Sequence, residues 1–187
     1  MNSDFFETNN YFVDKKNSFQ EHYQIYNHKR ERIGKVKQKL TRAQKILRHL
    51  GRGWLPFFVE IRSANGGLEA SVIRKGIFIS EIIIQDADGK KVGAIDSKSS
   101  FSKPEFKILN ASNEIIAEIG DVWKKSNFII NDSAENQIGS INKKWTGSMQ
   151  NMVRSGRSYN VNIMDNFGNN DEKLAILTSA IVINMFL

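Results

Sequence analysis

The chain of 187 residues contains no cysteine and only two prolines. The absence of cysteine excludes disulfides and thiolate chemistry, and it leaves the redox compartment undetermined. The scarcity of proline and the lack of a low-complexity linker argue against a second domain. We therefore expect a single domain over residues 1–187, in which residues 1–10 form a flexible end and residues 171–187 form a central helix.

Signals of catalysis are also missing. The three histidines (His22, His28 and His49) lie in the first 49 residues of the chain, and none has the spacing of a metal-ligand pair. The sequence has no nucleophile elbow, no phosphate-binding loop and no H-E-x-x-H motif. We therefore expect no enzyme activity, no catalytic residue, no bound metal and no cofactor.

Signals for export or membrane insertion are weak. The start of the chain, "MNSDFFETNNYFVDKK", has neither the basic beginning nor the apolar stretch of a signal peptide, so we expect a cytoplasmic location. The longest uncharged run extends from Leu174 to Leu187, fourteen residues, whereas a membrane-spanning helix needs about 20. This run is therefore too short for an ordinary membrane anchor.

The same run is predicted to be a buried helix. Asn170 is the expected N-cap, and Asp171 and Glu172 in the first turn suit the positive end of the helix dipole. Apolar side chains fall on every face of this helix, which is typical of a helix that is enclosed on all sides. The rest of the chain must therefore supply a wall around it.

A repeated hairpin supplies that wall. Apolar and polar residues alternate along most of the chain, as in half-buried β-strands. Each unit has a strand, a polar turn that starts with Asn or Asp, and a small residue seven positions later, followed by another strand. We expect the small residue to let its strand approach another element closely. The pairs are Asn27 with Gly34, Asp86 with Gly93, Asn110 with Ala117 and Asp132 with Gly139, and Ser63 with Ala70 fits more loosely.

The spacing of the turns indicates the architecture. From Ser63 onward the turns recur every 22 to 24 residues, which is about one hairpin per unit. Ten to twelve strands follow from this count, and a closed sheet of that size has an interior too wide for its own side chains to fill. We therefore predict a mainly β (α+β) fold, a closed antiparallel barrel of hairpins around the C-terminal helix.

One segment makes the chain basic. Between Lys29 and Arg52 there are ten Lys and Arg residues and a single acidic residue, Glu31. From Leu40 to Leu50 the apolar residues follow helical spacing, so a basic amphipathic helix is predicted over residues 37–50. Candidate lipid- or anion-binding residues are Lys35, Lys37, Lys39, Arg42, Lys45, Arg48 and Arg52. An anionic membrane surface, a nucleic acid or a protein could bind here, and the charges could also serve only solvation.

The ordered set of motifs resembles a known group. The stretches "YFVDKK", "YQIYNHKRERIGKVKQKL", "LPFFVEIR", "DADGKKVGAI", "FKILNASNEIIAEI", "NQIGSINKKWTG" and "YNVNI", followed by the apolar helix, cover nearly the whole chain. They are similar to the tubby C-terminal-like (LURP-one-related) superfamily, and most closely to its bacterial phospholipid-scramblase-related branch. The resemblance implies a twelve-stranded antiparallel barrel around a central C-terminal helix. It also implies a role at membranes, through binding or transbilayer movement of phospholipids.

The resemblance bears on calcium as well. Eukaryotic scramblases carry an acidic calcium segment before the terminal helix, and Asp171 matches one of its acidic positions. Residues Ser155–Ser158 stand where further acids are expected, and "DNFG" (Asp165–Gly168) resembles the motif but falls several residues too late. Two interpretations remain open, a calcium segment and a simple turn between the last strand and the helix, and we favour the turn.

Together these observations predict a scramblase-like, membrane-peripheral protein that interacts with anionic phospholipid, located on the inner face of the plasma membrane. The alternative is a nucleic-acid-binding or protein-interaction module that uses the basic segment 29–52.

Overall fold

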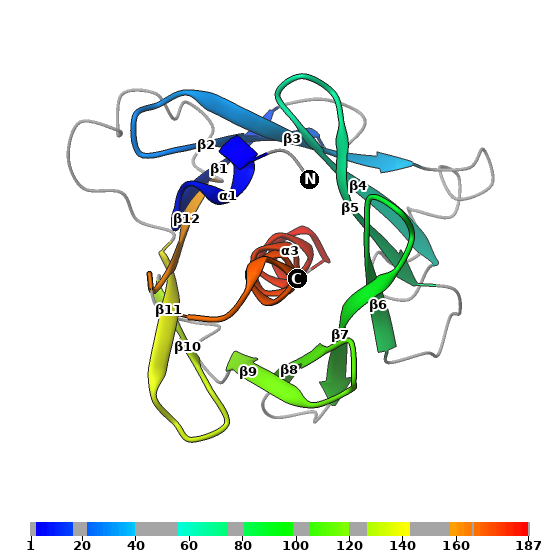
Figure 1. Ribbon diagram of the computed structural model, residues 1–187, viewed down its shortest axis with the longest axis vertical. Coiled ribbons are helices and arrows are strands. Elements are labelled where there is room, and N and C mark those ends of the chain that lie inside the picture. Colours follow the sequence, from blue (N-terminus) through cyan, green and yellow to red (C-terminus); the bar gives the residue numbers. More distant parts are fainter. Residues whose placement is uncertain are drawn as a thin grey trace.

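A computed structural model describes residues 3–16, 22–39, 56–74, 81–98, 105–119, 127–142, 158–165 and 167–186. These residues form two helices and twelve strands (Figure 1). The elements are α1 (Ser3–Phe6), β1 (Asn10–Lys16), β2 (His22–Tyr26), β3 (Arg32–Lys39), β4 (Phe57–Ser63), β5 (Leu68–Arg74), β6 (Glu81–Asp86), β7 (Lys91–Lys98), β8 (Glu105–Asn110), β9 (Ile115–Ile119), β10 (Asn127–Asn131), β11 (Gln137–Asn142), β12 (Tyr159–Ile163) and α3 (Asn170–Phe186).

The strands form a closed antiparallel barrel. Each strand pairs with the strands that precede and follow it, and β1 pairs with β12 to close the sheet. At this closure Tyr11 lies opposite Val161, and Val13 lies opposite Tyr159. Figure 1 shows the strands surrounding α3 on all sides. The predicted barrel of hairpins around a C-terminal helix is therefore confirmed.

Five tight turns lie at one end of the barrel, which we call the turn end. In four of them the first side chain accepts two backbone N–H groups, as Asn27 Oδ1 does from Lys29 at 2.9 Å and Glu31 at 3.0 Å. The same pair of bonds recurs at Asp86, Asn110 and Asp132. Asn and Asp favour such turns because their side chains bond to the backbone two residues on.

The fourth residue of every turn has a positive φ. These residues are Arg30, Gly66, Gly89, Asn113 and Glu135. The repeat read from the sequence therefore corresponds to one backbone conformation that is used five times.

The glycines that follow three of the turns, Gly34, Gly93 and Gly139, mark close approaches, as predicted. A Cβ atom at Gly93 would lie 2.6 Å from the Leu109 carbonyl oxygen and 2.9 Å from the Ala175 Cβ of α3. A Cβ atom at Gly139 would lie 2.5 Å from the Asn162 carbonyl oxygen. Gly93 is therefore the point at which both a neighbouring strand and the central helix press against the wall.

The central helix is capped one residue earlier than predicted. Asn169, not Asn170, is the N-cap: its Oδ1 accepts the Glu172 N–H at 3.0 Å, and Glu172 Oε2 accepts the Asn169 N–H at 3.3 Å. This reciprocal pair is a capping box. From Leu174 to Ile183 every side chain is buried, so the prediction of an enclosed helix is confirmed.

The residues before β1 cover part of the turn end. Helix α1 packs against β3, and Phe5 is 1% exposed. The Phe5 ring meets Phe6 edge-on with 5.4 Å between centroids, and the Tyr11 hydroxyl donates to the Phe5 carbonyl at 3.2 Å. These contacts fix residues 3–8 beside the β2–β3 turn.

One buried residue departs from the repeat. In each hairpin a bulge places an extra residue just before the small residue. In four hairpins this extra residue is apolar: Ile33, Val92, Ile116 and Ile138. In the β4–β5 hairpin it is Glu69, which is 1% exposed and whose Oε2 has no hydrogen-bond partner among the described residues. A buried polar atom without a partner is destabilising.

We expect Glu69→Val to raise the free energy of unfolding by about 1–3 kcal/mol, because it removes the unsatisfied oxygen and restores the apolar residue of the sister hairpins. Urea unfolding measures the change. Glu69→Gln is the matched control, since it keeps the shape and leaves a polar group buried, and it should gain far less. Destabilisation by Glu69→Val would show that the carboxylate contributes to the fold.

Candidate anion-binding face

Three of the predicted site residues lie on the outer face of β3. Lys35, Lys37 and Lys39 alternate with Gly34, Val36 and Gln38, which are buried. Alternate residues of a strand point to the same side, about 7 Å apart. Lys37 and Lys39 are exposed and Lys35 is half-buried. The strand therefore presents a row of three ammonium groups away from the barrel interior.

The neighbouring strand adds one cation and one buried acid to this row. In the pairing of β3 with β4, Lys35 lies opposite Arg62 and Lys37 opposite Glu60. Glu60 is 5% exposed and forms ion pairs with Lys39 and with Arg62, whose Nε lies 2.9 Å from its Oε2. Burial alone would raise the pKa of Glu60, but the hydrogen bonds from Lys39 and Arg62 hold it below its usual value.

The carboxylate of Glu60 therefore forms ion pairs with Lys39 and Arg62, but not with Lys35 or Lys37. Neither Lys35 nor Lys37 forms an ion pair with any residue of the part that the structure describes. Sequence reasoning missed Glu60, because an acidic residue on an alternating strand is normally taken to be solvated. Its position opposite Lys37, with Lys39 and Arg62 nearby, is the only signal that could have indicated its burial.

The predicted amphipathic helix needs one correction. Strand β3 continues to Lys39, so the helix does not begin at Lys37 as predicted. The spacing of Lys35, Lys37 and Lys39 has the period of a strand, and the apolar positions that indicate a helix start only at Leu40. Arg42, Lys45, Arg48 and Arg52, together with the remainder of that helix, lie outside the described residues.

The segment from Asp165 to Gly168 connects β12 with α3. Phe167 N–H bonds to the Met164 carbonyl at 3.1 Å, and Gly168 has a φ of 65°. The exposed carboxylate of Asp165 accepts a hydrogen bond from Asn9 Nδ2. In the ranges given above for the structure, no three His, Asp or Glu side chains are grouped so that they could hold a metal ion.

A cavity that was not predicted lies at the turn end. It has a volume of about 580 Å³ and lies between the segment of Phe5, Glu7 and Thr8, the β2–β3 turn and the β4–β5 turn. A second cavity of about 490 Å³ shares Glu7, Thr8 and His28 with it and extends to Met164 and Asp165. In the sequence, the cations of the β2–β3 turn belong to the basic segment 29–52. Their position in the hairpin repeat is the signal that could have distinguished them from the rest of that segment.

Comparison with known proteins identifies the family. Residues 5–186 match the Scramblase family. The chain belongs to the Scramblase family. No curated protein matches, and the structure search found a protein from Arabidopsis thaliana of known X-ray structure. That protein is 12% identical, with 72% of this chain and 84% of that chain covered and a TM-score of 0.35, so the two are only distantly similar.

Scramblase membership confirms the sequence-based resemblance and gives the chain a lipid-related role in general terms. No helix in the described part of this scramblase-family chain has the length and apolar character needed to cross a bilayer. The match spans the barrel and α3 together, so both elements belong to the family domain.

Proposed function

We propose that this scramblase-family protein is membrane-peripheral and binds anionic phospholipid through the outer face of β3. The observation that carries the proposal is the row of Lys35, Lys37 and Lys39, in which the first two are free of ion pairs within the described residues. Each Lys near an anionic headgroup layer contributes about 1 kcal/mol of attraction. The barrel serves as a rigid support that holds these charges in a line.

The proposal extends to the basic residues that follow β3 in the sequence. Arg42, Lys45, Arg48 and Arg52 follow within thirteen residues of Lys39 in the sequence, and we include them among the proposed lipid-binding residues. Lipid of the inner leaflet of the plasma membrane is anionic, and we place the protein in the cytoplasm, at that surface. Transbilayer movement of lipid is a further step, tested separately by following the exchange of a labelled lipid between the leaflets of vesicles.

We expect Lys35→Glu combined with Lys37→Glu to weaken binding to anionic vesicles at least 30-fold, because two attractions of about 1 kcal/mol each are lost. Flotation with neutral vesicles and with vesicles containing an anionic lipid measures the effect. The control is Lys90→Glu with Lys91→Glu on the β6–β7 hairpin, which changes the net charge by the same amount and in addition breaks the ion pair of Lys91 with Glu81.

Two results would contradict the proposal. Equal losses in both double variants would mean that only the net charge matters, and equal binding of the unmodified protein to neutral vesicles would remove the role of the lysines. A gel shift with RNA at physiological salt, made with the same variants, shows whether the face prefers nucleic acid to lipid.

A further inference from the structure

The other four turns of the repeat show which residue types are usual in this turn conformation, and the β2–β3 turn can be compared with them. The four sister turns carry small, amide or acidic residues at their second, third and fourth positions: Ala64-Asn65-Gly66, Ala87-Asp88-Gly89, Ala111-Ser112-Asn113 and Ser133-Ala134-Glu135. The β2–β3 turn instead carries His28, Lys29 and Arg30. Its hydrogen bonds to Asn27 are the same as those in three of its sisters. The hydrogen bonds that form the turn therefore do not involve these three side chains.

One of the three even opposes the turn. Arg30 has a φ of 67°, in a position where two sisters have glycine, one has asparagine and one has glutamate. A long side chain in this conformation is strained, whereas glycine adopts it freely. The arginine is present although the turn would form more easily without it.

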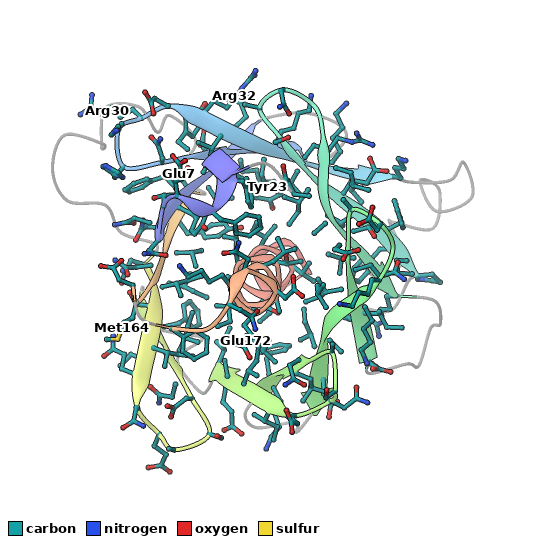
Figure 2. The ribbon with its side chains drawn as sticks, in the orientation of Figure 1. Glu7, Tyr23, Arg30, Arg32, Met164 and Glu172 are labelled. Carbon is teal, nitrogen blue, oxygen red and sulfur yellow. The ribbon has the colours of Figure 1, made fainter. Side chains whose placement is uncertain are left out.

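These residues border the larger cavity at the turn end. Lys29 and Arg32 line it together with Glu7 and the apolar residues Phe5 and Ile33. Within the part of the chain that the structure describes, neither Lys29 nor Arg32 takes part in an ion pair. Figure 2 shows Arg30 and Arg32 at the periphery beside the β2–β3 hairpin and Glu7 closer to α1.

Glu31, the acidic residue of the β2–β3 turn, helps to form the turn itself. Glu31 Oε2 accepts the Asn27 amide at 2.8 Å, and Glu114 Oε2 accepts the Asn110 amide at the same distance in the β8–β9 turn. Because the pair recurs in a sister turn, Glu31 is explained by turn structure. The cations of the cavity are left without such an explanation.

We propose that this cavity binds a phosphate ester of a small polyol, such as glycerol phosphate. Lys29 and Arg32 hold the phosphate, since Arg and Lys are the usual phosphate ligands. Glu7 accepts hydrogen bonds from the hydroxyl groups, and Asn65 donates one to them through Nδ2, because its Oδ1 already accepts from Ser63 and Gly67. A volume of about 580 Å³ lies within the ordinary range for a small-molecule site.

This site adjoins the lipid-binding face at the turn end of β3. Arg32 and Lys35, the first lysine of that face, are three residues apart, about 10 Å along an extended strand. The ligand is a soluble phosphate ester or the same group on a lipid. Titration with glycerol 3-phosphate and with a short-chain phosphatidylglycerol below its micelle concentration distinguishes the two sources, and binding of either supports the site.

The repeat supplies the variant for the test. The β2–β3 turn reads NHKRE and the β8–β9 turn reads NASNE, so their central residues can be exchanged. The exchange variant carries His28→Ala, Lys29→Ser and Arg30→Asn together with Ala111→His, Ser112→Lys and Asn113→Arg. Composition and net charge stay the same, and each turn keeps the Asn and Glu of its framework. Besides the position of the cations, the exchange changes one hydrogen bond, from Lys91 to Asn113.

Calorimetric titration with glycerol 3-phosphate measures binding. We expect the exchange variant to bind at least tenfold more weakly than the unmodified protein. Arg32→Gln, which introduces the residue of the sister position Gln137, should weaken binding as well and serves if the exchange variant does not fold. Vesicle flotation of the exchange variant should be unchanged, because Lys35 and Lys37 are intact.

Equal affinity of the exchange variant and the unmodified protein would overturn the proposal. Failure of the unmodified protein to bind both phosphate compounds would overturn it too. Either failure leaves the lipid-binding face untouched, because that face is tested by vesicle flotation in the absence of any soluble ligand.

Discussion

Replacing Ile181 with alanine is expected to lower the free energy of unfolding by about 2–5 kcal/mol. Ile181 is 0% exposed in the middle of α3, and truncation leaves a cavity that the surrounding strands cannot close, because a closed barrel has no free edge by which to contract. Urea unfolding of the two proteins measures the loss.

The control for this substitution is Ile129→Ala. Ile129 lies on β10 and is 49% exposed, so the same chemical change removes far less buried surface and should cost less than 1 kcal/mol. If the two variants lost equal stability, α3 would not be the core of this barrel, and every site placed on the wall would have to be reconsidered.

Replacing Gly93 with alanine is expected to cost about 3 kcal/mol, at the upper end for overpacking. The new methyl group would lie 2.6 Å from the Leu109 carbonyl oxygen of β8 and 2.9 Å from Ala175 of α3. Both contacts are too short, and they lie on two different elements, so one shift cannot relieve them. For a chain of this length the midpoint of thermal unfolding should fall by about 6–12 °C.

Gly89→Ala is the matched control for Gly93→Ala. Gly89 has a φ of 82° and no atom within 4 Å of the new methyl position, so only backbone strain of about 1 kcal/mol is added. A larger loss at Gly89 than at Gly93 would mean that turn conformation, and not close packing, explains the glycines of the repeat. The alanines at positions 70 and 117 show that the repeat tolerates a methyl group where the neighbours leave room.

The turns and the barrel could be predicted from the sequence because their signals are local and repeated. Asn27, Asp86, Asn110 and Asp132 each form the same two bonds to the backbone, so a single physical rule explains four turns. The buried helix could be predicted because its apolar residues cover all of its faces and some part of the chain must enclose them.

Other features depend on contacts that a linear sequence does not reveal. Asn169 and Asn170 are equally suitable caps by residue type, and only the backbone decides between them. Glu60 is buried because Lys39 and Arg62 converge on it from two strands. The cavity at the turn end requires residues 5–8 to lie against turns that are more than 15 residues further along the chain.

The order of elements along the chain has a consequence for biosynthesis. The twelve strands precede α3 in the sequence, so a ribosome completes the whole wall before it produces the segment that fills it. Adjacent hairpins can form early because their contacts are local, but the pairing of β1 with β12 joins residues about 150 positions apart. Until α3 emerges, the inner faces of the nascent strands remain exposed to water and to other chains. Molecular chaperones that shield apolar surface should therefore act on this protein mainly during the interval between the synthesis of β1 and the release of α3.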